Sequence, residues 1–266
     1  MNYSEFIYDV LSQASFLANN YFGKVSGVTK KDDNNQVLTQ ADLEIGKFLG
    51  NKVIEIFPQY NVIDEEAGVI DQGADLTWVI DPIDGTSNFA NGIPTYGIYI
   101  GLLQKNTPIA GGVALPSFQK IYTAEKGAGC FCNKLLVTVS SEKNLAQSLV
   151  AYQMDGHPES PENTRKELEI FGRILPAIRN ERTSNSAFDC AMVIEGRYGA
   201  LLNQSSKIWD NVAQQILIEE AGGIYTDFFG KSIDYSFPLK RSNENFTYCA
   251  GSPLLYQQLQ SLIHQE

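Results

Sequence analysis

The expected secondary structure changes near residue 145, and no linker separates the two parts of the chain. The first part begins with two helical segments and continues as short β-rich segments, whereas the second alternates strands with helices. No internal repeat, low-complexity tract or Gly/Ser-rich stretch interrupts the sequence. We therefore expect one domain over residues 1–266, in which two merged halves, about 1–145 and 146–266, share a core of the layered α/β (α+β) class.

Apolar periodicity and turn residues give the positions of the individual elements. Helices are expected at about residues 4–18, 42–56, 163–175, 187–195, 209–221 and 253–263. Strands are expected at about residues 61–63, 76–81, 96–103, 109–115, 120–124, 136–140, 149–153, 199–202 and 224–227.

The chain has only two histidines, and they argue against a hydrolase built on a cluster of histidine ligands. His264 lies two residues from the end of the sequence, and His157 lies in a run of turn-forming residues. No Gly-x-Ser-x-Gly motif supports a Ser-His-Asp triad. Catalysis is therefore expected from carboxylates and other oxygen ligands.

The net charge of −11, from 20 basic and 31 acidic residues, argues against binding to nucleic acid or to an anionic membrane surface. An acidic protein that acts on an anionic substrate would need metal cations to reverse the charge locally. No segment has the roughly 20 apolar residues of a membrane span, and the first basic residue is Lys24, which argues against a signal peptide. We expect a cytoplasmic protein with reduced cysteines at positions 130, 132, 190 and 249.

The hexapeptide Asp-Pro-Ile-Asp-Gly-Thr at residues 81–86 carries the strongest chemical signal, because five of its six positions have a mechanical role. It follows an apolar strand, so Asp81 should lie at the strand's end. Pro82 should stop further pairing, and a tight turn should bring Asp84 back beside Asp81. A short helix beginning at Thr86 would offer free amides to a phosphate. Two carboxylates for a hard cation beside an anion site indicate Mg²⁺-assisted phosphoryl chemistry.

Two other segments place acids at the end of a strand or the start of a helix. Glu65 and Glu66 follow the strand at 61–63, and Asp210 opens the helix at 209–221. Taken alone, Asp210 is better explained as a helix cap, and the glutamate pair as exposed loop charges.

In combination, these motifs resemble the inositol monophosphatase family of Mg²⁺-dependent, lithium-sensitive phosphatases. The first signature is the Trp78–Thr86 segment with Asn88, Phe89 and Pro94, and the second runs from Trp209 and Asp210 to Glu220, Ala221, Gly222 and Gly223. Segments 38–42 and 127–133 and the glutamate pair also match in order and spacing. The resemblance implies an αβαβα sandwich of the sugar phosphatase type, a homodimer, and hydrolysis of a small polyol or sugar phosphate such as inositol 1-phosphate.

The resemblance also implies two or three Mg²⁺ ions in each active site. The first ion would bind to Glu65, Asp81 and the Ile83 carbonyl, and the second to Asp81, Asp84 and Asp210. A weaker third ion would use Glu65 and waters. Lys31 lies at the matching distance for a lysine of a site loop.

Further roles follow from the same resemblance. Thr86 and Glu65 would orient and deprotonate the attacking water, with Asp42 hydrogen-bonded to Thr86. The phosphate would be received by the Gly85 and Thr86 amides, together with the metal ligands Asp84 and Asp210. Ser186 and Asn203 would lie on the side of the substrate's alcohol.

Substrate identity stays open, because this sequence departs from the family on the alcohol side. Inositol-specific members usually carry a glutamate where this chain has Asn203, and an amide both donates and accepts hydrogen bonds. Asp64 adds a charge where a small residue is frequent. The alternatives are fructose 1,6-bisphosphate, the 2′-phosphate of NADP or 3′-phosphoadenosine 5′-phosphate. Ser87 and Asn88 match the inositol and sugar type better than the nucleotide type. A non-catalytic metal- or ligand-binding homologue is disfavoured by the complete set of acids.

Overall fold

The computed structural model describes residues 2–24, 27–30, 33–156 and 160–265. Its helices are α1 (Tyr3–Tyr21), α2 (Gln40–Ile56), α3 (Thr86–Ala90), α4 (Pro161–Ile174), α5 (Ala187–Ile194), α6 (Ile208–Glu220) and α7 (Pro253–Ile263). A small hairpin pairs β1 (Val28–Lys30) with β2 (Asp33–Leu38). His157 and Lys31, which the sequence analysis singled out, lie outside the described residues.

Two larger sheets organise the chain. The first has the order β10-β9-β8-β7-β6-β5-β3-β4, and the second has the order β12-β11-β13-β15-β14. The strands of the first are β3 (Asn61–Asp64), β4 (Gly68–Ile70), β5 (Leu76–Asp84), β6 (Gly97–Gln104), β7 (Thr107–Leu115), β8 (Lys120–Glu125), β9 (Gly129–Cys132) and β10 (Leu135–Val137). Those of the second are β11 (Leu149–Gln153), β12 (Asn180–Glu181), β13 (Ala200–Ser206), β14 (Ile224–Thr226) and β15 (Phe246–Gly251).

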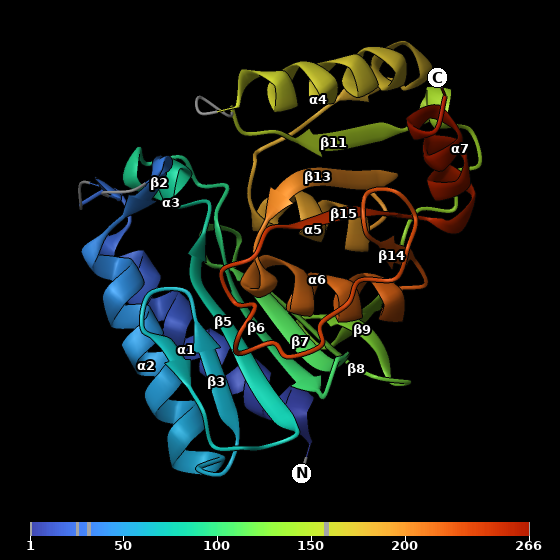
Figure 1. Ribbon diagram of the computed structural model, residues 1–266. Helices are drawn as coiled ribbons and strands as arrows, with labels where there is room; N and C mark the ends of the chain where they lie inside the picture. Colours follow the sequence, from blue (N-terminus) through green and yellow to red (C-terminus); the bar gives the residue numbers. More distant parts are fainter. Residues whose placement is uncertain (1, 25–26, 31–32, 157–159, 266) are drawn as a thin grey trace.

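Helices and sheets alternate in five layers (Figure 1). Helices α1 and α2 cover the outer face of the first sheet, and α5 and α6 lie between the two sheets. Helices α4 and α7 cover the outer face of the second sheet. The expected αβαβα sandwich is therefore confirmed.

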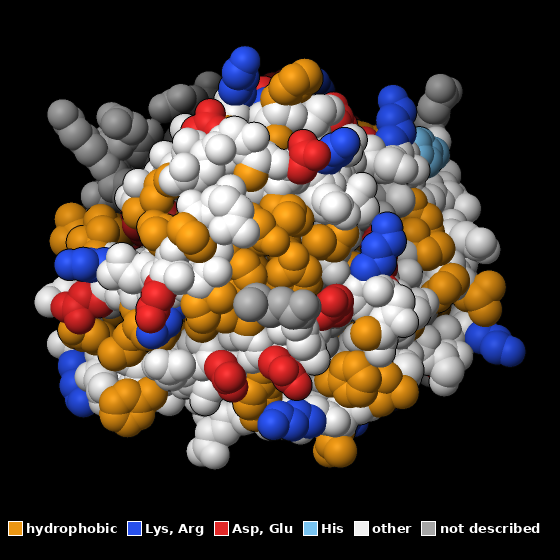
Figure 2. Space-filling view, turned by 90° about the horizontal axis from the view of Figure 1, so that it is seen from below, with side chains coloured by type: hydrophobic (Ala, Val, Ile, Leu, Met, Phe, Trp, Pro, Cys, Tyr) orange, Lys and Arg blue, Asp and Glu red, His pale blue; other side chains and the backbone are white. Residues whose placement is uncertain are grey.

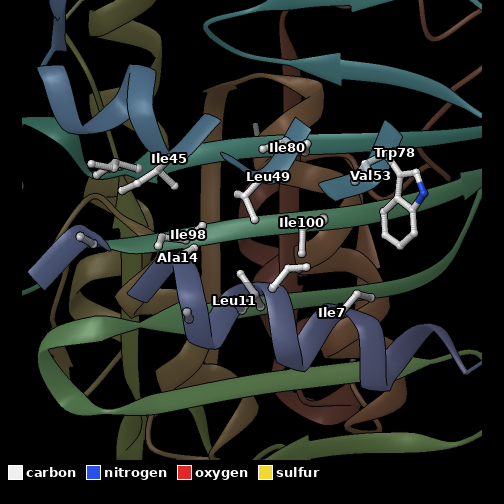
Figure 3. Packing of buried hydrophobic residues seen from close by; sticks show 14 of the residues in the cluster. Ile7, Leu11, Ala14, Ile45, Leu49, Val53, Trp78, Ile80, Ile98 and Ile100 are labelled. Atoms are coloured by element: carbon white, nitrogen blue, oxygen red, sulfur yellow. The ribbon is translucent and has the colours of Figure 1, made fainter. Parts of the chain in front are cut away.

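The outermost layer is held by amphipathic helices whose apolar faces pack on the first sheet. Buried side chains recur at helical spacing on α1 and α2, and they meet inward-facing side chains of β5 and β6 (Figure 3). This cluster includes Ile7, Leu11, Ala14, Ile45, Leu49, Val53, Trp78, Ile80, Ile98 and Ile100. Packing of α2 against β5 brings the first turn of α2 to the end of β5 where the acidic residues lie.

Helix α6 lies close to the first sheet because two of the strands beneath it present glycines. A Cβ atom added at Gly101 of β6 would lie 2.7 Å from Val212 Cγ1 and 2.9 Å from the backbone nitrogen of Ala213. One added at Gly111 of β7 would lie 2.7 Å from Ile216 Cγ2. The absence of side chains here lets the backbones approach, which fixes the position of Asp210 in the first turn of α6.

Gly101→Ala is therefore expected to lower the free energy of unfolding by about 1–3 kcal/mol, because the added methyl overpacks a contact with backbone atoms. Gly50→Ala in α2 is the matched control. An added Cβ at Gly50 meets nothing within 4 Å, so helix propensity should stabilise that variant by up to about 1 kcal/mol. Urea unfolding of both variants measures the difference, and equal stabilities would contradict the close approach of α6.

Strand β5 differs from the sequence expectation. It continues past Asp81 to Asp84, although Pro82 was expected to stop the pairing. The register against β6 shifts between Asp81 and Asp84, which pair with Tyr99 and Gly97. An irregularity of this kind takes the intervening residues out of the ladder, so a proline without an N–H is tolerated.

The face of the molecule seen in Figure 2 carries both acidic and basic side chains. Figure 2 shows hydrophobic side chains gathered near the middle of the face seen from below, with lysines and arginines scattered among acids around them. Basic side chains form no single patch on this face. Among the described residues, no helix is both long enough and apolar enough to pass through a bilayer. All four cysteines are free thiols, as expected.

Candidate active site

Three aspartates from two distant parts of the chain meet at one point. Asp81 and Asp84 lie at the end of β5, and Asp210 lies in the first turn of α6. One carboxylate oxygen from each lies within 4.8 Å of the others, a spacing that a metal ion can span. Asp210 is also part of the helix cap, because its Oδ2 accepts a hydrogen bond from the Lys207 N–H at 2.6 Å. Asp210 therefore both caps α6 and belongs to the acidic cluster.

Glu65 reaches the same site from the end of β3. Strands β3 and β5 run parallel, so their ends lie side by side, and the Glu65 N–H donates to the Ile80 carbonyl at 3.2 Å. The charge of Glu65 raises the pKa of both Asp81 and Asp84. A glutamate that could be read as an exposed loop charge thus acts electrostatically on the aspartates.

Burial and mutual repulsion shift the ionisation of these acids. Burial, then the charges of Glu65, Asp84 and Asp210, raise the pKa of Asp81 well above its ordinary value. Burial and neighbouring carboxylates do the same to the pKa of Asp84, and burial raises the pKa of Asp210 to about 6. So many carboxylates at one point are unfavourable without positive counter-charge.

Asp81 shows the demand for a cation most directly. Its side chain is 2 % exposed, and its Oδ1 has no hydrogen-bond partner among the residues that the structure describes. An unpaired carboxylate oxygen at such a depth is costly unless it binds a cation. Carboxylates and a carbonyl are the hard oxygen ligands that Mg²⁺ takes, so the residues present fit that ion.

Thr86 links the end of β5 to helix α2. Its Oγ1 lies 2.8 Å from the Ile83 carbonyl oxygen and 3.2 Å from Asp42 Oδ1. The other oxygen of Asp42 accepts hydrogen bonds from the N–H and the hydroxyl of Thr39, at 2.8 and 2.5 Å. Asp42 is buried, and this burial raises its pKa to about 6. The expected contact between Thr86 and Asp42 is present, and the capping box of α2 holds Asp42 in place.

Gly85 and Ser186 form the opposite side of the cluster. Gly85 has φ +88° at the start of α3, and a Cβ atom added there would lie 2.6 Å from Ser186 Cβ. The backbone of Ala187, next after Ser186, lies close enough to the Asp84 carboxylate to lower its pKa in part. The second half of the chain therefore contacts both the glycine and a member of the acidic cluster.

Asn203 and Asp64 have local partners. The Asn203 amide donates to Gln153 Oε1 at 3.4 Å, and its oxygen accepts from the Ser205 N–H at 2.5 Å. Asp64 Oδ1 accepts from the N–H groups of the two residues at 66 and 67, so Asp64 shapes the turn after β3. One carboxylate oxygen of Asp64 therefore stabilises this turn by accepting hydrogen bonds from its backbone.

A comparison with protein families identifies the family to which the chain belongs. The model of the inositol monophosphatase family matches residues 2–266, which covers nearly the whole chain. This chain belongs to the inositol monophosphatase family. It is accordingly an enzyme, a phosphoric monoester hydrolase, and the resemblance inferred from the sequence motifs is confirmed.

Individual relatives agree with the family assignment. The fructose-1,6-bisphosphatase/inositol-1-monophosphatase of Aquifex aeolicus is 31 % identical over 212 residues, which are 77 % of this chain and 78 % of that protein. The Nus factor SuhB of Pseudomonas aeruginosa is 31 % identical over 210 residues, 77 % of each protein. The solved structure of the Thermotoga maritima IMPase has a TM-score of 0.85 at 25 % identity, and the match covers 99 % of this chain and 97 % of that one.

Sequence reasoning placed Ser186 on the alcohol side of the substrate but gave no role to Asp189 and its polar partners. Asp189 is buried with 0 % exposure and accepts hydrogen bonds from Thr183, Ser184, Asn185 and Gln153. The signal that could have found it is an acid in the first turn of an expected helix, preceded by a run of hydroxyl and amide residues.

Proposed function

We propose that this phosphatase is a Mg²⁺-dependent phosphomonoesterase that hydrolyses a small polyol or sugar phosphate of the inositol 1-phosphate type. The observation that carries the proposal is the cluster of Asp81, Asp84 and Asp210, with one oxygen of each within 4.8 Å, beside Thr86. The family supplies the phosphatase class, and the cluster supplies sites for the cations that an acidic chain needs to accept a phosphate ester.

The proposed metal ligands are the clustered carboxylates and one carbonyl. Glu65, Asp81 and the Ile83 carbonyl would hold one Mg²⁺ ion, Asp81, Asp84 and Asp210 a second, and Glu65 a weaker third. When bound, the ions would neutralise the charge of the phosphate ester and lower the pKa of a bound water, so that it could be deprotonated at neutral pH. The buried Oδ1 of Asp81, which has no hydrogen-bond partner in the described part of the chain, supports its role as the shared ligand.

The chain's own residues would direct the water that attacks phosphorus. Thr86 has one hydroxyl proton, which it can donate to the Ile83 carbonyl at 2.8 Å or to Asp42 Oδ1 at 3.2 Å, and its oxygen can also accept a hydrogen bond from the water. In the proposed deprotonation, Thr86 would take the proton of the water as it passes its own proton to Asp42. Asp42 is held by Thr39 and takes no part in the acidic cluster itself. Glu65 would act with Thr86 as the second group that orients and deprotonates the water.

The phosphate and the alcohol would lie on different sides of the cluster. Amides at the beginning of α3, those of Gly85 and Thr86, point out of the helix and would receive the phosphate together with Asp84 and Asp210. Ser186 and Asn203 are proposed on the alcohol side. The contact between Gly85 and Ser186 supports this placement, because it puts the second half of the chain next to the phosphate position.

Initial rates of phosphate release with and without Mg²⁺ test the proposal. The substrates are inositol 1-phosphate, fructose 1,6-bisphosphate, NADP and 3′-phosphoadenosine 5′-phosphate. We expect release that requires Mg²⁺, with the polyol or sugar phosphate as the best substrate. Activity that persists without divalent cations would contradict the metal assignment. Preference for a nucleotide would mean that the proposed substrate class is wrong. No turnover of any of these esters would favour a non-catalytic role.

The assembly is a separate proposal. We infer a homodimer from the family resemblance, with a small-molecule phosphate ester as the partner of each site. Light scattering on the purified protein measures the molar mass, which for the dimer is twice the 29.4 kDa of the chain.

A further inference from the structure

The segment Thr183–Ser186, called here the 183–186 loop, is held from three sides. On the first side, the Asp189 carboxylate accepts hydrogen bonds from the backbone N–H groups of Ser184 and Asn185 and from the hydroxyls of Thr183 and Ser184, at 2.8–3.1 Å. These bonds satisfy both carboxylate oxygens, and the side chain is fully buried. A buried carboxylate with this many donors fixes the backbone around it.

The second support comes from β11. Gln153 Nε2 donates to Asp189 Oδ2 at 2.9 Å and to the Ser186 carbonyl at 3.0 Å. Gln153 Oε1 accepts from the Tyr248 hydroxyl at 2.5 Å and from the Asn203 amide at 3.4 Å. Every donor and acceptor of this amide is used, so the orientation of Gln153 is determined. The network thereby joins the loop to Asn203, the residue that replaces the family's usual glutamate.

The third support comes from the other half of the chain. Asn88, in α3, donates its amide hydrogens to the Ser184 carbonyl and the Thr95 carbonyl, both at 2.8 Å. The loop is thus tied to α3, the short helix that follows Gly85. Ser186, at the end of the loop, packs directly against Gly85. The loop is therefore a rigid connection between the phosphate side of the site and the polar network of Gln153 and Asn203.

We propose that Asp189 is a positioning residue that acts with Asn88 to hold the 183–186 loop against Gly85 and so fixes the wall met by the alcohol part of the substrate. That the alcohol part of a substrate meets this wall rests on the proposed function. The hydrogen bonds of Asp189 go to the 183–186 loop and to Gln153 rather than to Asp81, Asp84 or Asp210, and its only effect on the cluster is the charge that raises the pKa of Asp84, so we expect it to act on the substrate through the loop. Its loss should therefore weaken substrate binding more than the chemical step.

Asp189→Asn tests this with little change of shape. The amide nitrogen would face N–H donors in place of an accepting oxygen, which releases part of the loop. For the best substrate of the wild-type enzyme we expect KM to rise by about 10- to 100-fold, while kcat changes by less than about threefold. Inhibition by inorganic phosphate should change little, because phosphate lacks the alcohol.

Glu195→Gln is the matched control at the other end of α5. Glu195 accepts from Lys120 Nζ at 2.5 Å and from the Tyr122 hydroxyl at 2.6 Å, so its substitution also removes charge-assisted hydrogen bonds. It should lower the melting temperature without changing KM. An unchanged KM in Asp189→Asn, or an equal rise in both variants, would overturn the positioning role.

A double-mutant cycle and hydrogen exchange complete the test. If Asn88 and Asp189 act through the same loop, the effects of Asn88→Ala and Asp189→Asn on KM should be less than additive in the double variant. Amides of residues 183–187 should exchange faster in Asp189→Asn than in Glu195→Gln, and equal exchange would refute the proposal. This readout needs no activity. If the wild type turned over no ester, the proposed function would fail while the exchange experiment still decided the role of Asp189.

Discussion

Asp84→Asn is expected to lower the rate of Mg²⁺-dependent phosphate release by about 10²–10³-fold, because it removes the charge of a proposed Mg²⁺ ligand where transition-state charge would be neutralised. Asp84 lies with Asp81 and Asp210 in the cluster, so the substitution leaves that cluster with one carboxylate fewer. The asparagine amide keeps an oxygen that can face the nearby Ala187 backbone, so we expect the local structure to stay intact. Initial rates at saturating Mg²⁺ measure the effect.

The same substitution should stabilise the metal-free protein. Burial and the charges of Asp210, Glu65 and Asp189 raise the pKa of Asp84, so its ionised form is unfavourable in the folded state. Removing that charge relieves the repulsion, and the melting temperature in EDTA should rise. Asp9→Asn, at an exposed position of α1, is the control and should change neither quantity. Loss of activity accompanied by loss of stability would indicate misfolding, and activity within about threefold of wild type would contradict the metal assignment.

Much of the site could be predicted because its chemistry lies in short segments. The hexapeptide at 81–86 contains three metal-ligand candidates (two carboxylates and the Ile83 carbonyl), the flexible glycine and the threonine within six positions. The short helix α3 follows from local rules and begins at Thr86 as expected, whereas β5 continues through Pro82 to Asp84 in place of the expected turn. The convergence of Asp210 on this segment could not be derived locally. It depends on the close packing of α6 on Gly101 and Gly111, and only the family resemblance indicated it.

Strand β15 shows where local reasoning failed in the fold. The sequence analysis placed no strand between residues 227 and 253, yet β15 lies in the second sheet between β13 and β14. Five of its six residues are buried, so it lacks the alternation of apolar and polar residues that marks a half-exposed strand. The partners of Asp189 were missed for a related reason. Gln153, in β11, lies 36 positions away in sequence, and the packing of α5 against the second sheet brings it to Asp189.

The metal-free protein is expected to become more stable as the pH falls from about 7.5 to about 5, which is the reverse of ordinary acid denaturation. Burial raises the pKa of Asp42 and of Asp210 to about 6, and it also raises the pKa of Asp81 and Asp84. An acid whose pKa is raised by folding contributes stability that is present below its unfolded pKa and is lost as the pH rises through its folded pKa. Asp42 and Asp210 should each contribute about 1 kcal/mol over this range.

Mg²⁺ should cancel this dependence, since cations favour the ionised carboxylates that the metal-free fold disfavours. At about pH 7.5 the melting temperature should rise with Mg²⁺ concentration, whereas at about pH 5, where protons occupy the acids, the increase should be much smaller. Melting curves at both pH values, in EDTA and in Mg²⁺, give the four measurements. Asp210→Asn should weaken both the pH dependence and the stabilisation by Mg²⁺, because one carboxylate is responsible for part of each. Equal stabilisation by Mg²⁺ in Asp210→Asn and wild type would show that the cation binds elsewhere, even if the enzyme were active.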